Sequence, residues 1–145
     1  MPQYKVLIHF VWTTKNRKPL ITSALKPLLL SHIRSNAYSK GIWIDRINCV
    51  NDHIHLLIAQ GSEQNQSKIV MLIKGESSYW VNKEKLIPDR FEWQTEYFAE
   101  SVSPYHADGL RKYIENQEEH HRVKSFDEEY QLLLKGARLE KKGLG

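Results

Sequence analysis

The chain has 145 residues, of which 41% are hydrophobic and 26% charged, and these proportions exclude a disordered or collagen-like protein. Lys and Arg outnumber Asp and Glu by 21 to 17, so the net charge of +4 permits binding to a polyanion without requiring it. A single cysteine, Cys49, excludes an internal disulfide, no apolar run is long enough for a membrane helix, and no secretory leader is visible. We therefore expect one cytoplasmic domain with no membrane partner.

Four segments have the composition of strands. Residues 5–14 are rich in β-branched and aromatic side chains and too short for a long helix. Residues 42–50 and 53–60 are separated by the turn signal Asn51-Asp52, which predicts a hairpin. A fourth strand is expected over residues 97–103.

Helical segments alternate with these strands. The first is expected from the cap at Thr22-Ser23 to Gly41, burying Leu25, Leu28, Leu29 and Ile33. The second covers residues 67–85, with Ile69, Leu72, Ile73 and Trp80 turned inward. The third begins with Ser103 as cap and Pro104 as first residue, runs to about Lys124, and is followed by a short charged helix from Phe126. The order β-α-β-β-α-β-α predicts an α+β fold, a ferredoxin-like antiparallel sheet with packed helices.

The triplet His53-Ile54-His55 opens the third predicted strand. Side chains alternate between the two faces of a strand, so both imidazoles point the same way and can converge on one divalent cation. A His-apolar-His triplet also arises by chance in a chain with 7 histidines. On its own, the triplet therefore leaves both a metal site and a coincidence open.

Tyr113 and Gln117 lie four residues apart in the last predicted helix and therefore share a face, which His121 continues and His120 adjoins. A phenol beside a metal-ligating amide or imidazole is a plausible nucleophile. The alternative is a half-buried tyrosine that packs the helix against the sheet, and the pattern alone favours that alternative.

Other phosphate chemistries lack their required residues. Hydrolases with three alternating histidines need one at position 57, where Leu57 stands, and no second His-x-Thr/Ser tripeptide accompanies the first. The chain also contains no glycine-rich phosphate loop, nucleophile elbow or H-E-x-x-H motif.

The chain resembles the single-tyrosine HUH transposases of small bacterial insertion sequences, including their relatives associated with repeated extragenic palindromes (REP). The similarity covers nearly the whole chain and is carried by HFVWTTKNRKPLI, DHIHLLI, SKIVMLIKGESSYW, WQ followed by SVS, and RKYIENQEEHH. A His-hydrophobe-His triplet with a downstream Tyr-x-x-x-Gln is a specific combination, because the family needs both parts.

This resemblance implies a metal-dependent enzyme that cleaves and rejoins single-stranded DNA at hairpin-marked ends. His53, His55 and Gln117 would hold one Mg²⁺ or Mn²⁺, and Tyr113 would form a covalent 5′-phosphotyrosine. Family members are typically homodimers with joined sheets, and in several the tyrosine helix of one subunit completes the active site of the other. The catalytic domain would then span residues 1–125, with 126–145 as a short helix and tail of the same domain.

Basic residues expected to contact the DNA are Lys15, Arg17, Lys18 and Arg111. Such a protein would be associated with the nucleoid when bound to DNA. Two other functions stay open: a domesticated, non-catalytic module that binds hairpin DNA, and a small metal-dependent phosphodiesterase that uses water in place of the tyrosine.

Overall fold

The structure, a computed structural model, describes residues 6–117, which follow the predicted order β-α-β-β-α-β-α. The strands are β1 (Val6–Thr13), β2 (Trp43–Cys49), β3 (His53–Gln60) and β4 (Phe98–Val102). The helices are α1 (Leu25–Ser39), α2 (Gln66–Lys83) and α3 (Pro104–Glu115), and a short 3₁₀ turn, η1 (Lys15–Arg17), follows β1.

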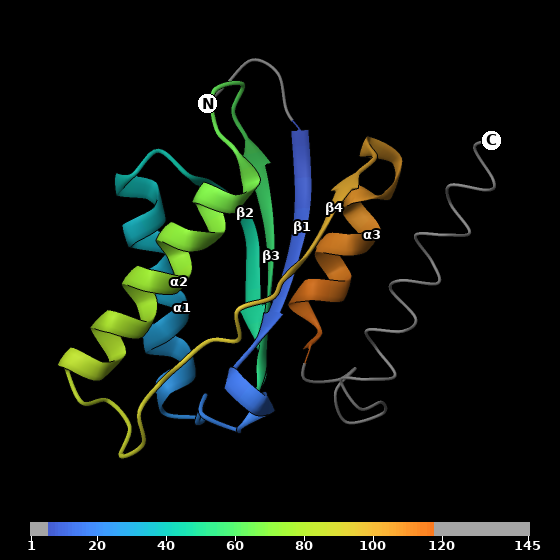
Figure 1. Cartoon of the computed structure of the whole chain (residues 1–145). Coiled ribbons are helices and arrows are strands. Elements are labelled where there is room, and N and C mark those ends of the chain that lie inside the picture. Colours follow the sequence, from blue (N-terminus) through green and yellow to red (C-terminus); the bar gives the residue numbers. More distant parts are fainter. Residues whose placement is uncertain (1–5, 118–145) are drawn as a thin grey trace.

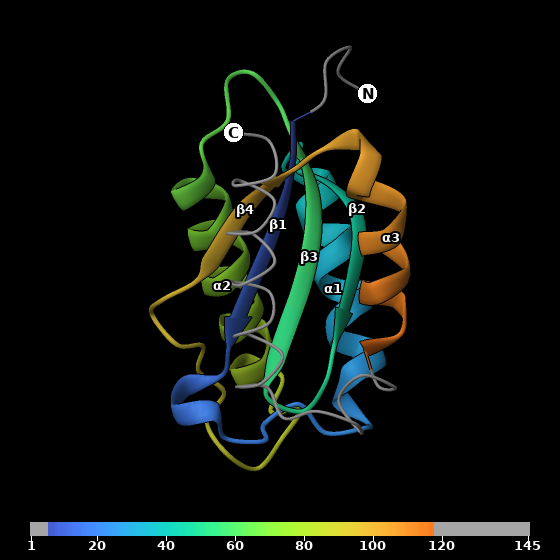
Figure 2. The same cartoon turned by 90° about the vertical axis from the view of Figure 1, so that its right-hand side faces the viewer.

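The four strands form one antiparallel sheet in the order β2-β3-β1-β4. Helices α1 and α2 cover one face of this sheet and α3 covers the other, next to β2 (Figures 1 and 2). This three-layer arrangement confirms the predicted α+β, ferredoxin-like fold. We call the two faces of the sheet the α1/α2 face and the α3 face.

The alternation of side chains along β3 divides its residues between these two faces. Ile54, Leu56 and Ile58 join the hydrophobic core beneath α1 and α2, which also contains Phe10 and Trp12 of β1. His53 and His55 consequently lie on the α3 face. A near-continuous run of buried residues in β3 shows that the strand is covered on both sides, as expected for the centre of a three-layer fold.

Ahead of α1, the Thr22 hydroxyl accepts a hydrogen bond from the Leu25 amide at 3.1 Å, but the residue directly before the helix is Ala24, which makes no side-chain cap bond. Helix α1 buries Leu25, Leu29, Ile33 and Ala37. The expectation that Leu28 is buried is wrong, since 51% of this residue is exposed. In the described part of the chain, no helix has both the length and the hydrophobicity needed to cross a membrane.

Helix α3 begins as predicted, with Pro104 in its first turn and the Ser103 hydroxyl accepting from the Tyr105 amide at 3.2 Å. It ends at Glu115, and Asn116 leaves helical geometry at φ −103° and ψ 29°. The predicted helix is therefore interrupted at Asn116, and Gln117 is helical again. The rest of the expected span, 118–124, lies outside the described residues. The charged helix expected from Phe126 lies outside the described residues.

Candidate active site

Two buried imidazoles stand side by side on the α3 face. His53 and His55 are both fully buried, and their ring centroids lie 5.1 Å apart. They come from consecutive same-face positions of β3, whose central place in the sheet fixes their backbone on both sides. The structure thus brings these two side chains together, as the alternation predicts.

Each imidazole is oriented by a contact to its Nδ1 atom. The Nδ1 of His53 donates to Oδ1 of Asp52 at 2.8 Å, and the Nδ1 of His55 lies 3.0 Å from Nε2 of His9 on β1. A histidine held through Nδ1 has Nε2 as the atom with which it can ligate a metal. Both rings are therefore oriented to ligate through Nε2.

Tyr113 and Gln117 approach the same place from α3 and from the residues just after it. The ring of half-buried Tyr113 lies 5.7 Å from that of His55, at an interplanar angle of 80°. Gln117 is fully buried, and its Nε2 donates to the Tyr113 carbonyl at 3.2 Å. Its Oε1 is buried without a hydrogen-bond partner among the described residues. An unsatisfied buried amide oxygen is unusual and fits a metal ligand.

The donor set of two imidazoles and one carboxamide suits Mn²⁺ and, with added water or phosphate oxygens, Mg²⁺. Across residues 6–117, no group of three or more His, Cys, Asp or Glu side chains is arranged to hold a metal ion. A cation at this site would therefore depend on the amide oxygen of Gln117 as its third protein ligand.

Polar contacts fix α3 against β2. Arg111 donates through Nε and Nη2 to both carboxylate oxygens of Asp45, at 2.8 and 2.9 Å, and through Nη1 to Asp108 at 2.7 Å. The hydrogen bond to Asp45 is the main cause that raises the pKa of Arg111 above its ordinary value. Arg46 forms a further, more exposed pair with Glu115 at 2.7 Å.

Arg111 thus has protein partners on two sides, and its expected contact with DNA stays a prediction. The bidentate pair with Asp45 is the kind of planar match for which arginine is suited. The structure gives this residue a part in holding the tyrosine helix.

The predicted basic residues Lys15, Arg17 and Lys18 are exposed in and beside η1. Lys15 forms an ion pair with Glu92 at 3.1 Å. This basic turn lies at the end of the sheet where β3 begins, because the Thr14 amide donates to the Asp52 carbonyl at 2.9 Å. Exposed cations therefore stand beside the strand end that carries His53.

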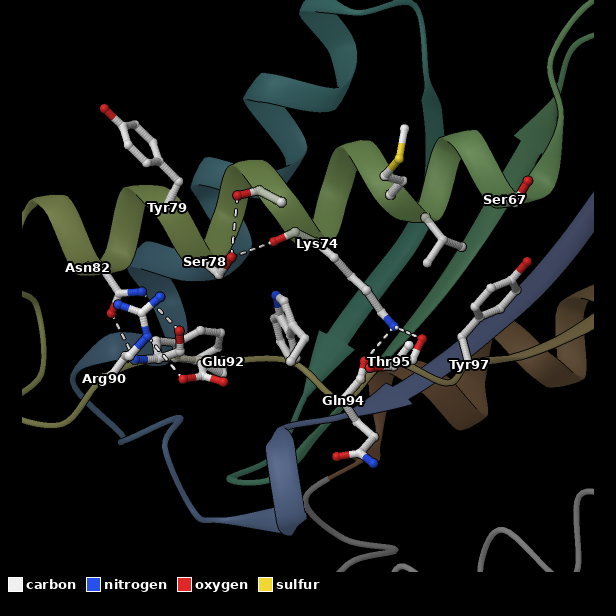
Figure 3. Close-up of a pocket in the computed structure, with 15 residues that line it drawn as sticks. Ser67, Lys74, Ser78, Tyr79, Asn82, Arg90, Glu92, Gln94, Thr95 and Tyr97 are labelled. Carbon is white, nitrogen blue, oxygen red and sulfur yellow. Dashed lines mark hydrogen bonds and ion pairs between the residues drawn. The ribbon is translucent and has the colours of Figure 1, made fainter.

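A groove lies on the other side of the molecule, beside α2. This groove, of about 680 Å³, runs between α2 and residues 90–97 (Figure 3). Lys74 projects across it and donates to the carbonyls of Gln94, Thr95 and Glu96 at 2.6, 3.0 and 3.1 Å. Burial lowers the pKa of Lys74 to about 8. The groove is formed by α2, so it is distinct from the site on the α3 face.

Three side chains around the histidines were not predicted from the sequence: His9, Asp52 and Asn48. Asp52 directly precedes His53, and a carboxylate next to a metal-binding histidine is a recognisable signal. His9 lies on the α3 face of β1, but its contact with His55 spans 46 residues and depends on strand register. Asn48 bonds to α3 through a contact of similar sequence separation.

Comparison with known families assigns the chain to a class. The family described as "Transposase IS200 like" matches residues 2–117, which is most of the chain. With the antiparallel fold and the two-histidine site, this match defines the class: the protein belongs to the IS200-like transposases, a family of DNA-processing enzymes.

Within that family, the chain is similar to the ISDra2 transposase TnpA of Deinococcus radiodurans. The two are 28% identical over 120 residues, covering 79% of this chain and 85% of the relative.

Solved structures share the fold. A crystal structure described as a transposase from Deinococcus radiodurans R1 matches with a TM-score of 0.64 and 24% identity, covering 79% of this chain and 92% of that one. A REP-associated tyrosine transposase bound to a REP hairpin matches with a TM-score of 0.63 and 13% identity, covering 83% and 73% respectively.

Proposed function

We propose that this protein is a metal-dependent transposase that cleaves and rejoins single-stranded DNA at hairpin-marked ends through a covalent 5′-phosphotyrosine on Tyr113. The observation that carries the proposal is the meeting of His55, Tyr113 and Gln117 on the α3 face. The Tyr113 ring lies 5.7 Å from the His55 ring, and the buried Oε1 of Gln117 has no hydrogen-bond partner in the described part of the chain. Membership of a transposase family supplies the reaction class.

His53, His55 and Gln117 are the residues that would hold Mg²⁺ or Mn²⁺. When bound, the cation would withdraw electron density from a phosphate oxygen and make the phosphorus a better electrophile. Asp52 and His9 orient the two histidines, so that little reorganisation is required when a ligand arrives.

In the proposed reaction, Oη of Tyr113 attacks the phosphorus of a DNA phosphodiester. The bond between tyrosine oxygen and phosphorus forms as the bond from phosphorus to the 3′ oxygen breaks. The phenol gives up its proton, and the departing 3′ oxygen takes one up as a hydroxyl. Because the phosphodiester is replaced by a phosphotyrosine ester, a later attack by another 3′ hydroxyl can reseal the strand without ATP.

The half-buried position of Tyr113 suits this role. Arg111, two residues before Tyr113 on the same helix, is hydrogen-bonded to Asp45 of β2. This link between helix and strand limits the motion of the nucleophile. A nucleophile held near its attack position has less orientational freedom to lose in the transition state.

The substrate is proposed from two separate observations. A relative with the same fold was solved bound to a REP hairpin, and the basic turn at η1 stands beside the start of β3. A homodimer is also proposed, from the family resemblance. His55 and Tyr113 of the same chain are already adjacent, so this subunit alone supplies the residues of the proposed site.

The test incubates the purified protein with single-stranded oligonucleotides that carry hairpins, with Mg²⁺ or Mn²⁺, and resolves the products on a denaturing gel. We expect a protein–DNA adduct that requires the metal and is absent in Tyr113→Phe. An adduct that persists in Tyr113→Phe would contradict the assignment of the nucleophile. Salt-sensitive hairpin binding without cleavage under either metal would instead support the non-catalytic DNA-binding module.

A further inference from the structure

Asn48 connects the histidine strand with the tyrosine helix. It lies in β2 directly opposite His55 of β3, and both side chains belong to the α3 face. The register of β2 shifts between Ile44 and Arg46, an irregularity that precedes Asn48 and gives it this alignment. Asn48 is therefore paired through the backbone with His55, a candidate metal ligand, while its side chain faces α3.

The orientation of the Asn48 amide is fixed by its own neighbour. Its Oδ1 accepts from the backbone amide of Cys49 at 2.9 Å, so the oxygen is directed toward β2. Its Nδ2 then faces α3 and donates to the carbonyls of Ile114 and Glu115, at 2.9 and 3.1 Å. The assignment of nitrogen and oxygen follows from the partners, because a backbone N–H can only donate and a carbonyl can only accept.

These two carbonyls belong to the last turn of α3, where helical carbonyls lack partners within the helix. Asn48 supplies a donor at the point where the helix ends and the chain turns toward Gln117. Ile114 directly follows Tyr113, and Gln117 in turn donates to the Tyr113 carbonyl at 3.2 Å. The Asn48 amide therefore acts on the short segment that carries both Tyr113 and Gln117.

We propose that Asn48 is a positioning residue for this site, one that sets the placement of Tyr113 and Gln117 relative to His55 by donating to the end of α3. The proposal rests on the proposed function. The ion pair between Arg46 and Glu115 joins the same two elements but is 40% and 53% exposed at its side chains. An exposed pair of this kind contributes little, whereas the half-buried amide of Asn48 makes two hydrogen bonds with fixed direction.

Two variants of Asn48 distinguish a role as hydrogen-bond donor from a role in filling space. Asn48→Asp keeps the volume but places a carboxylate oxygen against two carbonyl oxygens, whereas Asn48→Ala leaves space that water can enter. If donation matters, Asp is the more damaging change. If only volume matters, Ala is the more damaging one. Arg46→Ala is the matched control, because it removes the exposed link between β2 and α3 and leaves Asn48 intact.

The first measurement is amide hydrogen exchange without DNA or metal. Asn48→Asp is expected to speed exchange in residues 110–117 by about tenfold or more while α1 is unchanged, and Arg46→Ala to change it by about twofold or less. Exchange at the wild-type rate in Asn48→Asp would overturn the proposal. Should the Asp variant not fold, Asn48→Ala decides: faster exchange confined to residues 110–117 supports the proposal, and unchanged exchange overturns it.

The second measurement is the single-turnover rate of adduct formation with a hairpin oligonucleotide, together with its binding affinity. We expect about a 100-fold slower reaction for Asn48→Asp, about tenfold for Asn48→Ala, and unchanged hairpin affinity in both. Equal rates in wild type and Asn48→Asp would overturn the positioning role. If the wild type forms no adduct, the proposed function fails, and hydrogen exchange still decides whether Asn48 places the end of α3.

Discussion

The carboxylate of Asp52 provides a test of the proposed metal site that does not depend on DNA. Its Oδ1 accepts from Nδ1 of the fully buried His53 at 2.8 Å. Asp52→Ala removes this acceptor. The backbone of the turn keeps its own support, because the Asp52 carbonyl still accepts from the Thr14 amide at 2.9 Å. The change therefore acts mainly on the orientation and basicity of one imidazole.

The size of the effect follows from the geometry. Removing a partner that orients a metal-ligating histidine typically weakens metal binding by about 10- to 100-fold. The bond is short, and its histidine is 0% exposed, so water has poor access to replace the lost acceptor. We expect Mn²⁺ affinity to fall about 30-fold in Asp52→Ala, equal to about 2 kcal/mol. Asp52→Asn retains an amide oxygen that can accept the same hydrogen bond, so its loss should be about fivefold.

The assay is titration of the DNA-free protein with Mn²⁺, followed by electron paramagnetic resonance of the free ion. Asp108→Ala is the control, because it removes one negative charge from an exposed carboxylate on α3. It is expected to change the affinity by less than twofold. Equal Mn²⁺ affinity in wild type and Asp52→Ala would refute the reasoning, and a wild type that binds no Mn²⁺ would refute the site itself.

Two further predictions concern Lys74 and the basic turn. The pKa of Lys74 falls to about 8 from an ordinary 10.5, so the unfolded chain binds more protons between these values and the stability contribution of Lys74 rises with pH over that window. Because the side chain is only partly buried, the free energy of unfolding, measured with urea, should rise by about 1 kcal/mol or less between the two pKa values. An equally large rise in Lys74→Met would contradict this prediction. Replacing Arg17 and Lys18 by Ala should reduce the salt dependence of hairpin binding by about 0.7 per lost phosphate contact, measured as the slope of log K against log salt. Lys40→Ala changes an exposed residue just after the end of α1 and should leave that slope unchanged. An equally large reduction of the slope in Lys40→Ala would contradict a specific role of the basic turn in DNA binding.

Local pattern predicted most of the fold because the signals are strong within single segments. β3 begins and ends at the predicted residues, since its apolar run is bounded by a turn on one side and a polar loop on the other. Leu28 was misassigned because the buried stripe of α1 repeats every four residues through Leu25, Leu29 and Ile33, and the neighbouring Leu28 falls outside it. A leucine at the border of a stripe is not distinguished by periodicity alone.

The end of α3 illustrates what local pattern cannot supply. Neither Asn116 nor Gln117 is a strong helix breaker, yet α3 ends at Glu115 and Asn116 has non-helical geometry. The donor that meets its last carbonyls is Asn48, which is 66 residues away along the chain from Ile114. Such a contact exists only once the sheet has formed.

In the candidate site, too, some features follow from local sequence pattern and others only from tertiary packing. The shared face of His53 and His55 follows from strand alternation, and Tyr113 with Gln117 follows from helical spacing. Their meeting on the α3 face depends on the packing of α3 over β2 and β3. His9 was missed for the same reason, because its contact with His55 depends on the register between β1 and β3.

The ammonium of Lys74 has a consequence for the border of the sheet. It satisfies the carbonyls of three successive residues, Gln94, Thr95 and Glu96, just before β4 begins at Phe98. Without it, these carbonyls would be unpaired acceptors next to the edge strand β4, where another chain could form hydrogen bonds with them. By occupying these acceptors, a single lysine of α2 makes the β4 edge of the sheet a poorer template for aggregation.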